Sequence, residues 1–191
     1  MTAARHLVAI EADELLRIRD ACVKRLDYLD ATLPGRFQPA VQMVRKHASV
    51  LFGPKGGHPW VPVLGDLGRT SLLVNQTTGR LQGVVDLAGL CLLPLGMDFY
   101  AVDEIVGRCA EDGWHEESGA AAVRARFWGA FMSYMQGSTL QMEHLKAAWL
   151  AGILFRYGTP RDAGFAGLLG TLDDSTTGYQ VLDGLMSRFA L

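Results

Sequence analysis

The stretch VLGDLGRTSLLVN (residues 63–75), followed by GVVD (residues 83–86), decides the fold prediction for this chain. Short β-prone runs alternate here with glycine and polar residues, and TTG (residues 77–79) lies between the two parts. Such runs, joined by a few turn residues, are typical of a β-hairpin. The sequence therefore predicts a hairpin with one carboxylate before it, Asp66, and one after it, Asp86.

On both sides of this hairpin, apolar residues follow the three- and four-residue spacing of amphipathic helices. Within residues 11–33, for example, the predicted helical face consists of Leu15, Leu16, Ile18, Cys22, Val23, Leu26 and Leu29. Helices surrounding one small hairpin indicate an α+β, mostly helical fold, with residues 1–191 in a single domain and the hairpin region at 60–88. Helices are expected at residues 11–33, 37–52, 96–109, 120–135, 139–157 and 175–189, and strands at 60–64, 72–75 and 81–85.

Composition and charge exclude several classes of protein. The 191 residues are 49% hydrophobic and 20% charged, which suits one packed domain. The net charge of −2 comes from scattered residues, so we expect no nucleic-acid partner. The apolar run at 87–97 is too short to cross a bilayer, and we expect no membrane association and no secretion signal.

The cysteines and histidines do not have the spacing of a metal site. Cys22, Cys91 and Cys109 are far apart and odd in number, which favours free thiols in a cytoplasmic protein over disulfides or zinc. We therefore expect no bound metal.

The region from 63 to 86 resembles the catalytic loop of the aminoglycoside phosphotransferase and choline kinase-like family. There, four residues separate His-Gly-Asp from an Asn, and a hairpin then ends in Ile-Asp-Trp. Similarity to fungal phosphotransferase-like proteins extends over about residues 29–157, with landmarks at 95–100, 113–115, 127–128 and 154–158. The resemblance implies a protein-kinase-like C-terminal lobe. It also implies that Asp66 is the catalytic base, and that Ser71 and Asp86 occupy the positions of magnesium ligands.

The chain departs from that family at several points. Leu64 replaces the histidine, Ser71 the asparagine and Leu87 the tryptophan, and residues 87–93 are expected to form an apolar floor of the site. No glycine-rich loop followed by a strand lysine precedes residue 60, so the lobe that grips ATP is missing. Because phosphoryl transfer depends on groups that hold the phosphates, we expect a repurposed lobe that uses neither ATP nor any other cofactor.

The predicted site is a cleft for an apolar small molecule, with Asp66 and Asp86 as catalytic residues. An alternative is that both aspartates only anchor the loop through backbone N–H groups, that Ser71 bonds to the loop backbone, and that Arg69 is solvated. Substrate contacts are expected from Leu64, Arg69, Ser71, Leu87, Met97, Tyr100 and Asp103.

Three functions are compatible with such a site. The first is a cofactor-independent cyclase or isomerase of fungal secondary metabolism, for example one that closes a ring by holding a reactive conformer. The second is a residual small-molecule phosphotransferase that uses Mg-ATP, and the third is a noncatalytic, pseudokinase-like binding protein. Loss of a partner lobe also predicts an exposed apolar face through which two copies could form a homodimer.

Overall fold

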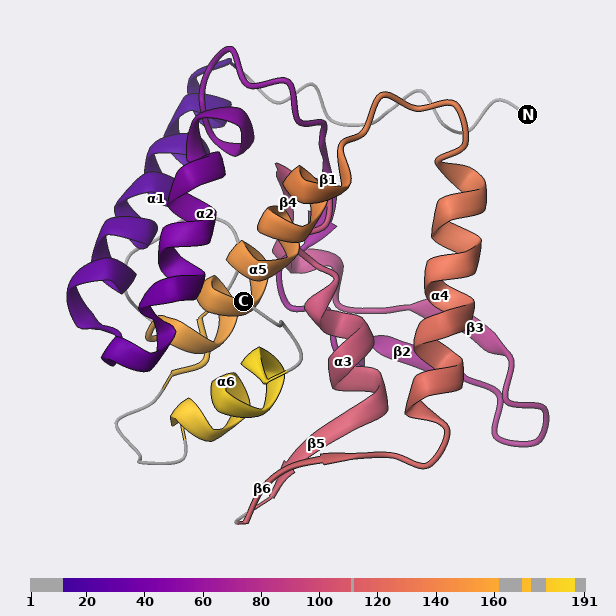
Figure 1. Ribbon diagram of the computed structural model, residues 1–191. Helices are drawn as coiled ribbons and strands as arrows, with labels where there is room; N and C mark the ends of the chain where they lie inside the picture. The colour runs from indigo at the N-terminus through magenta and orange to yellow at the C-terminus, as the bar shows by residue number, and fades with distance from the viewer. Residues whose placement is uncertain (1–11, 111, 162–169, 173–177, 188–191) are drawn as a thin grey trace.

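The computed structural model describes residues 12–110, 112–161, 170–172 and 178–187. This part of the chain is α+β and mostly helical, as predicted (Figure 1). Short 3-10 turns also occur at η1 (Gly35–Phe37), η2 (Arg69–Ser71) and η3 (Leu87–Gly89). The helices are α1 (Ala12–Thr32), α2 (Gln38–Leu51), α3 (Tyr100–Val106), α4 (Ala120–Tyr134), α5 (Met142–Gly158) and α6 (Gly178–Met186), and the strands are β1 (Trp60–Leu64), β2 (Leu72–Val74), β3 (Leu81–Val84), β4 (Leu90–Pro94), β5 (Gly107–Ala110) and β6 (Gly113–Glu116).

Helices α1, α2 and α5 build the hydrophobic core on one side of the molecule (Figure 1). On α1, the predicted residues Ile18, Cys22, Leu26 and Leu29 are buried, whereas Leu16 (49%) and Val23 (43%) are exposed. α2 carries Pro39 in its first turn, where the missing N–H has no intrahelical partner to lose. The helices predicted at 11–33, 37–52, 120–135 and 139–157 are confirmed, with bounds that shift by three residues at most.

The C-terminal half of α5 is buried on all sides, because α1, α2 and α6 pack around it. Gly152 allows the chain near Met97 to rest directly on the helix backbone. A Cβ atom at position 152 would lie 1.8 Å from the carbonyl oxygen of Met97. The same turn contains Gly96 at φ +101, a conformation that favours glycine.

The strands of the described residues form three two-stranded antiparallel sheets, β1–β4, β2–β3 and β5–β6. In the first, Leu64 at the end of β1 faces Leu90 at the start of β4. The second is the predicted hairpin, which is confirmed. In its turn, Asn75 Oδ1 accepts hydrogen bonds from the N–H groups of Thr77 (3.0 Å) and Thr78 (2.8 Å).

The prediction of one continuous helix over residues 96–109 is wrong. The helix is restricted to α3, and Gly107 begins strand β5, which pairs with β6. A Cβ atom at Gly107 would lie 2.3 Å from a ring carbon of Trp114, so the glycine gives the indole room to pack on the strand. The apolar floor expected at 87–93 is in large part strand β4. The C-terminal helix predicted at 175–189 is observed as α6, and its predicted start lies outside the described residues.

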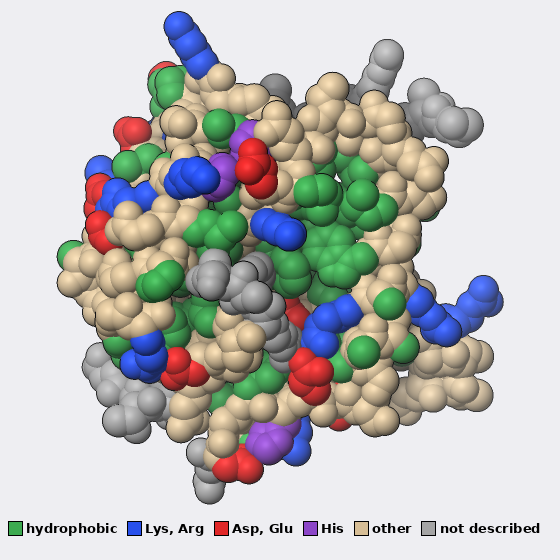
Figure 2. Space-filling model, in the orientation of Figure 1, with side chains coloured by type: hydrophobic (Ala, Val, Ile, Leu, Met, Phe, Trp, Pro, Cys, Tyr) green, Lys and Arg blue, Asp and Glu red, His purple; other side chains and the backbone are tan. Residues whose placement is uncertain are grey.

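Helix α4 stands on the opposite side of the molecule from α1 and α2 (Figure 1). Ala120 is its one buried residue among those described, and aromatic rings hold the rest of the helix in place. Trp128 lies 5.3 Å from Trp149 of α5, and Phe99 meets Phe127 edge to face at 5.2 Å between ring centroids. Figure 2 shows hydrophobic side chains gathered on this face between α4 and α5.

Candidate functional site

Backbone hydrogen bonds join the loop after β1 to the loop after β3. The N–H of Gly65 donates to the carbonyl of Gly89 (3.0 Å), and the N–H of Val85 donates to the carbonyl of Ser71 (2.9 Å). Each bond involves the residue just before one of the two predicted catalytic aspartates. These aspartates therefore belong to one local structure at the end of the β1–β4 ribbon.

Asp66 is the outer member of a polar network that reaches the buried end of α5. Its Oδ1 lies 2.5 Å from Nη1 of Arg156, whose side chain is 9% exposed. The Nε of Arg156 lies 3.4 Å from Oε1 of Glu104, and the hydroxyl of Tyr157 donates to the same oxygen. The Asp66 carboxylate is thus fixed in place by an ion pair.

Burial and neighbouring charges shift the pKa values of two members of this network, Arg156 and Tyr157. Burial lowers the pKa of Arg156, but the neighbouring Tyr100, Glu104 and Asp66 raise it more, and the net shift is upward. Burial raises the pKa of Tyr157, and the Glu104 carboxylate raises it further. Arg156 therefore stays cationic and Tyr157 stays neutral near pH 7, which suits an anchor for the loop better than a proton relay.

An open cavity of about 320 Å³ lies beside this network, with Arg69 and Trp114 among its walls. The guanidinium of Arg69 is already engaged, since it donates to the carbonyl oxygens of Glu104 (2.7 Å) and Gly107 (3.0 Å). It also pairs with the Glu117 carboxylate at 3.3 Å. Two of the three arginines that line the cavity, Arg69 and Arg156, are therefore engaged by protein oxygens, and Arg108 is the third.

Asp86 is placed differently from Asp66. Its side chain is exposed, and no hydrogen bond or ion pair of that side chain is found within the described residues. Its backbone has φ 60 and ψ 57, and it is the one described residue other than glycine with positive φ. Left-handed residues are uncommon outside glycine and often occur at functional sites, although Asp tolerates this region better than most.

Two of the predicted substrate contacts hold the loop together. The hydroxyl of buried Ser71 donates to the carbonyl of Asp66 (3.2 Å) and accepts from the N–H of Gly68 (3.4 Å). Leu64 is buried at the end of β1. These positions match the alternative in which Ser71 organises the loop backbone.

Of the remaining predicted contacts, four do not line the cavity beside Asp66. Met97 and Tyr100 belong to the hydrophobic core, and Asp103 is buried in an ion pair with Arg124 at 3.0 Å. Leu87 is 58% exposed on the surface next to Asp86. Arg69 is the one predicted substrate contact that the structure places in this cavity together with Asp66.

Sequence reasoning missed Arg156 and Glu104, the two residues that set the charge around Asp66. They lie far from it in the chain, so no local spacing connects them. A signal did exist, because Arg156 is a single charged residue in the apolar stretch from Ala147 to Gly158. A charge within a buried helix needs a partner, and this one has two.

Apolar side chains are exposed along the β2–β3 hairpin and its continuation. Leu81 is 61% exposed, and Leu90 is 51% exposed. Such exposure is unusual on a small sheet whose outer edges are also unpaired, and it typically marks a binding surface. The exposed members of this hairpin surface are Leu73, Val74, Leu81, Val84, Val85, Leu87 and Leu90.

No protein-family model, curated protein or solved structure matches this chain. None of the helices in the described residues has the length and hydrophobicity needed to cross a membrane. Within the same residues, no group of three or more His, Cys, Asp or Glu side chains is arranged to hold a metal ion. The resemblance to aminoglycoside phosphotransferases stays a prediction, and function has to be argued from the geometry of the site.

Proposed function

We propose that the loops carrying Asp66 and Asp86 bind an uncharged, apolar small molecule and convert it by a cofactor-independent cyclisation or isomerisation. The protein would then be a kinase-like C-terminal lobe that has lost its nucleotide function. The observation that carries this proposal is the exposed, unpaired carboxylate of Asp86, held at positive φ beside the exposed side chains of Val85 and Leu87. The Asp86 carboxylate can accept a hydrogen bond or a proton from the polar end of a substrate, while the apolar part of the substrate contacts Val85 and Leu87.

The proposed division of labour follows from the contacts of the two aspartates. Asp66 is fixed by Arg156 and keeps the loop in shape, whereas Asp86 is free to accept a hydrogen bond or a proton from the substrate. Holding one reactive conformer accounts for much of the rate enhancement in intramolecular reactions. An isomerisation needs no co-reactant, because the proton that Asp86 removes from one position is returned at another.

A noncatalytic binding role is the second candidate. It is favoured by the ion pair of Asp66, because the arginine already occupies an oxygen of the carboxylate that would have to act on a substrate. A residual phosphotransferase has less support, because the Arg69 and Arg156 side chains are already engaged by protein oxygens.

Asp86→Asn is expected to lower turnover about 100-fold, the usual contribution of a positioned acid or base. Asparagine keeps the shape of the side chain and tolerates positive φ, so the loop should remain intact. The measurement is conversion of polyenes and other uncharged apolar metabolites, first selected as compounds that raise the melting temperature of the protein.

Asp20→Asn, at an exposed position on α1, is the matched control and should leave turnover unchanged. Ligands that bind but are never converted would favour the noncatalytic candidate. Strong stabilisation by Mg-ATP, without stabilisation by apolar compounds, would replace the proposal with a phosphotransferase.

We also propose that the strands of the hairpin surface mediate formation of a homodimer through Leu73, Val74, Leu81 and Val84, which leaves Val85 and Leu87 beside Asp86 for the substrate. Unpaired strand edges with exposed apolar side chains favour pairing with a like strand from a second copy. Leu81→Lys and Val74→Lys together should shift the protein toward monomer in light scattering across a concentration series. A wild-type protein that stays monomeric at every concentration tested would refute this part of the proposal.

A further inference from the structure

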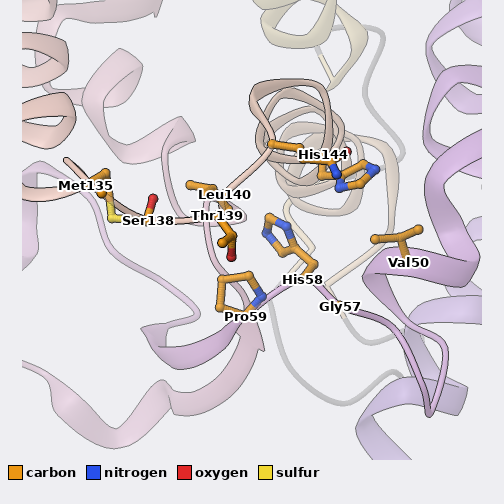
Figure 3. Close-up of a pocket in the computed structure, with 11 residues that line it drawn as sticks. Val50, Gly57, His58, Pro59, Met135, Ser138, Thr139, Leu140 and His144 are labelled. Atoms are coloured by element: carbon orange, nitrogen blue, oxygen red, sulfur yellow. The ribbon is translucent and has the colours of Figure 1, made fainter.

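A second cavity, of about 570 Å³, lies where the loop between α4 and α5 passes the start of β1 (Figure 3). Its walls come from the end of α2, the residues before β1, and residues 135–141 with the first turn of α5. Trp60 begins β1 and Leu64 ends it, so this cavity and Asp66 are at opposite ends of the strand. The cavity is therefore separate from the site of the proposed function, and the inference drawn from it is independent of that proposal.

His58 presents an unpaired nitrogen atom at this cavity. The residue is 5% exposed, and its Nε2 lies 2.8 Å from the carbonyl oxygen of Leu95. A carbonyl can only accept, so Nε2 carries the hydrogen and Nδ1 of the neutral ring carries a lone pair. Nδ1 is buried and has no hydrogen-bond partner among the residues that the structure describes. A buried acceptor without a donor is unfavourable, which makes this atom a marker for a missing ligand.

The N-terminus of α5 forms the neighbouring wall. The helix has 17 residues, and its N-cap residue Gln141 makes no side-chain capping bond. The first N–H groups of a helix have no partner inside it, and they form the positive end of the helix dipole. Ser138 and Thr139 add hydroxyl groups to the same wall, and Thr139 lies beside the ring of His58 in Figure 3. This wall favours a negatively charged group.

We propose that the cavity binds the oxyanion of a small molecule, a carboxylate or a phosphate, together with one proton shared between that oxyanion and Nδ1 of His58. An oxyanion that binds together with one proton satisfies both the lone pair of His58 and the N–H groups of α5, and its charge is favoured by the helix dipole. The proton comes from solvent and is shared between Nδ1 of His58 and an oxygen atom of the ligand. No other bond forms or breaks. Val50, Met135 and Leu140 supply apolar surface for the rest of the ligand.

The surroundings of His58 make this binding depend on pH. Burial lowers the pKa of His58, the hydrogen bond to the Leu95 carbonyl raises it, the nearby His144 lowers it, and the net shift is downward. The titratable groups on the elements around it are His144 and Glu143 of α5 and His47 of α2, with ring centroids of His58 and His144 6.4 Å apart. The free ring is therefore neutral near pH 7, and the proton is taken up with the ligand. Above that pH, affinity should fall about tenfold per pH unit.

The test is NMR of the full chain with ¹⁵N-labelled histidine side chains, titrated with hexanoate, inorganic phosphate and hexan-1-ol. With hexanoate or phosphate at about pH 6.5, the His58 Nδ1 resonance should move from the unprotonated toward the protonated position. Binding should weaken at least tenfold by about pH 8, and hexan-1-ol should cause no such change. The inference is overturned if neither anion moves the Nδ1 resonance, or if hexan-1-ol moves it equally.

The variant His58→Gln distinguishes the role of Nδ1 from that of Nε2. Its amide can still donate to the carbonyl of Leu95 in place of Nε2, but it has no atom equivalent to Nδ1. The variant should lose hexanoate and phosphate binding, whereas His115→Gln on β6 should retain both. Unchanged anion binding by His58→Gln would contradict the proposal. If that variant does not fold, the NMR titration of the native chain decides alone.

Discussion

Gly152→Ala is expected to destabilise the protein by about 4 kcal/mol or more, an unusually large effect for one methyl group. The added Cβ would lie 1.8 Å from the carbonyl oxygen, 2.7 Å from the carbonyl carbon and 3.0 Å from the Cα of Met97. These are backbone atoms, which cannot rotate away as a side chain can. The flanking residues Ala151 and Ile153 are fully buried, so α5 cannot shift without disturbing the core. Denaturant unfolding should show the lower free energy of unfolding. Thermal unfolding should show a drop in melting temperature of about 10 °C.

Gly129→Ala is the matched control for this prediction. Gly129 also lies inside a helix, α4, but a Cβ atom added there would have no heavy atom within 4 Å outside its own stretch of helix. Alanine has the higher helix propensity, so this variant should be stabilised by about 0.5–1 kcal/mol. The same substitution should thus have opposite signs at the two positions. Equal effects would mean that α5 does not rest on the turn at Met97.

The parts of the fold that the sequence predicted well are those defined by local periodicity. Helix α1 is an example, since its apolar residues recur at helical spacing, and strand β1 at 60–64 was predictable from a short β-prone run. The hairpin was also predictable, because Asn75 and residues 77–79 carry the turn chemistry within a few positions.

The elements that were missed depend on contacts between distant residues. Strand β4 exists because it pairs with β1, and its apolar sequence alone fits a buried floor equally well. Strand β5 is weakly β-prone and depends on Trp114 packing over Gly107. The Asp112-Gly113 dipeptide was the local signal that could have indicated this second hairpin.

In the candidate site, too, the residues that share a local sequence pattern were predictable, and the contacts between distant residues were not. The loop residues Asp66, Ser71 and Asp86 could be picked out because they follow one another in a recognisable order. Tyr100 was expected at a pocket because it follows the apolar run, but helix α3 turns its ring into the core. The ion pair between Asp66 and Arg156 joins the β1–β2 loop to α5, and only the tertiary structure reveals it.

Arg156→Met is expected to destabilise the protein by about 3 kcal/mol, because it removes the cation from a largely buried network. Its side chain is 9% exposed, and that of its partner Glu104 is 20% exposed, whereas Asp66 at 49% is well solvated. Most of the loss should therefore come from the Glu104 carboxylate, which is left with a hydroxyl donor and no positive charge. Thermal and denaturant unfolding measure the change.

The double variant Arg156→Met with Glu104→Gln tests that assignment. Removing both charges together should recover much of the lost stability, since a neutral amide can remain near the Tyr157 hydroxyl without a cation. Arg45→Met is the surface control, because Arg45 pairs with Asp27 at 2.8 Å and Asp30 at 3.1 Å on the exposed side of α1 and α2. It should cost no more than about 1 kcal/mol. If the double variant is no more stable than Arg156→Met alone, the buried charge of Glu104 is not what makes Arg156 necessary. The contact of the Arg156 guanidinium with the Tyr100 ring, 5.4 Å from its centroid, then takes its place as the cause.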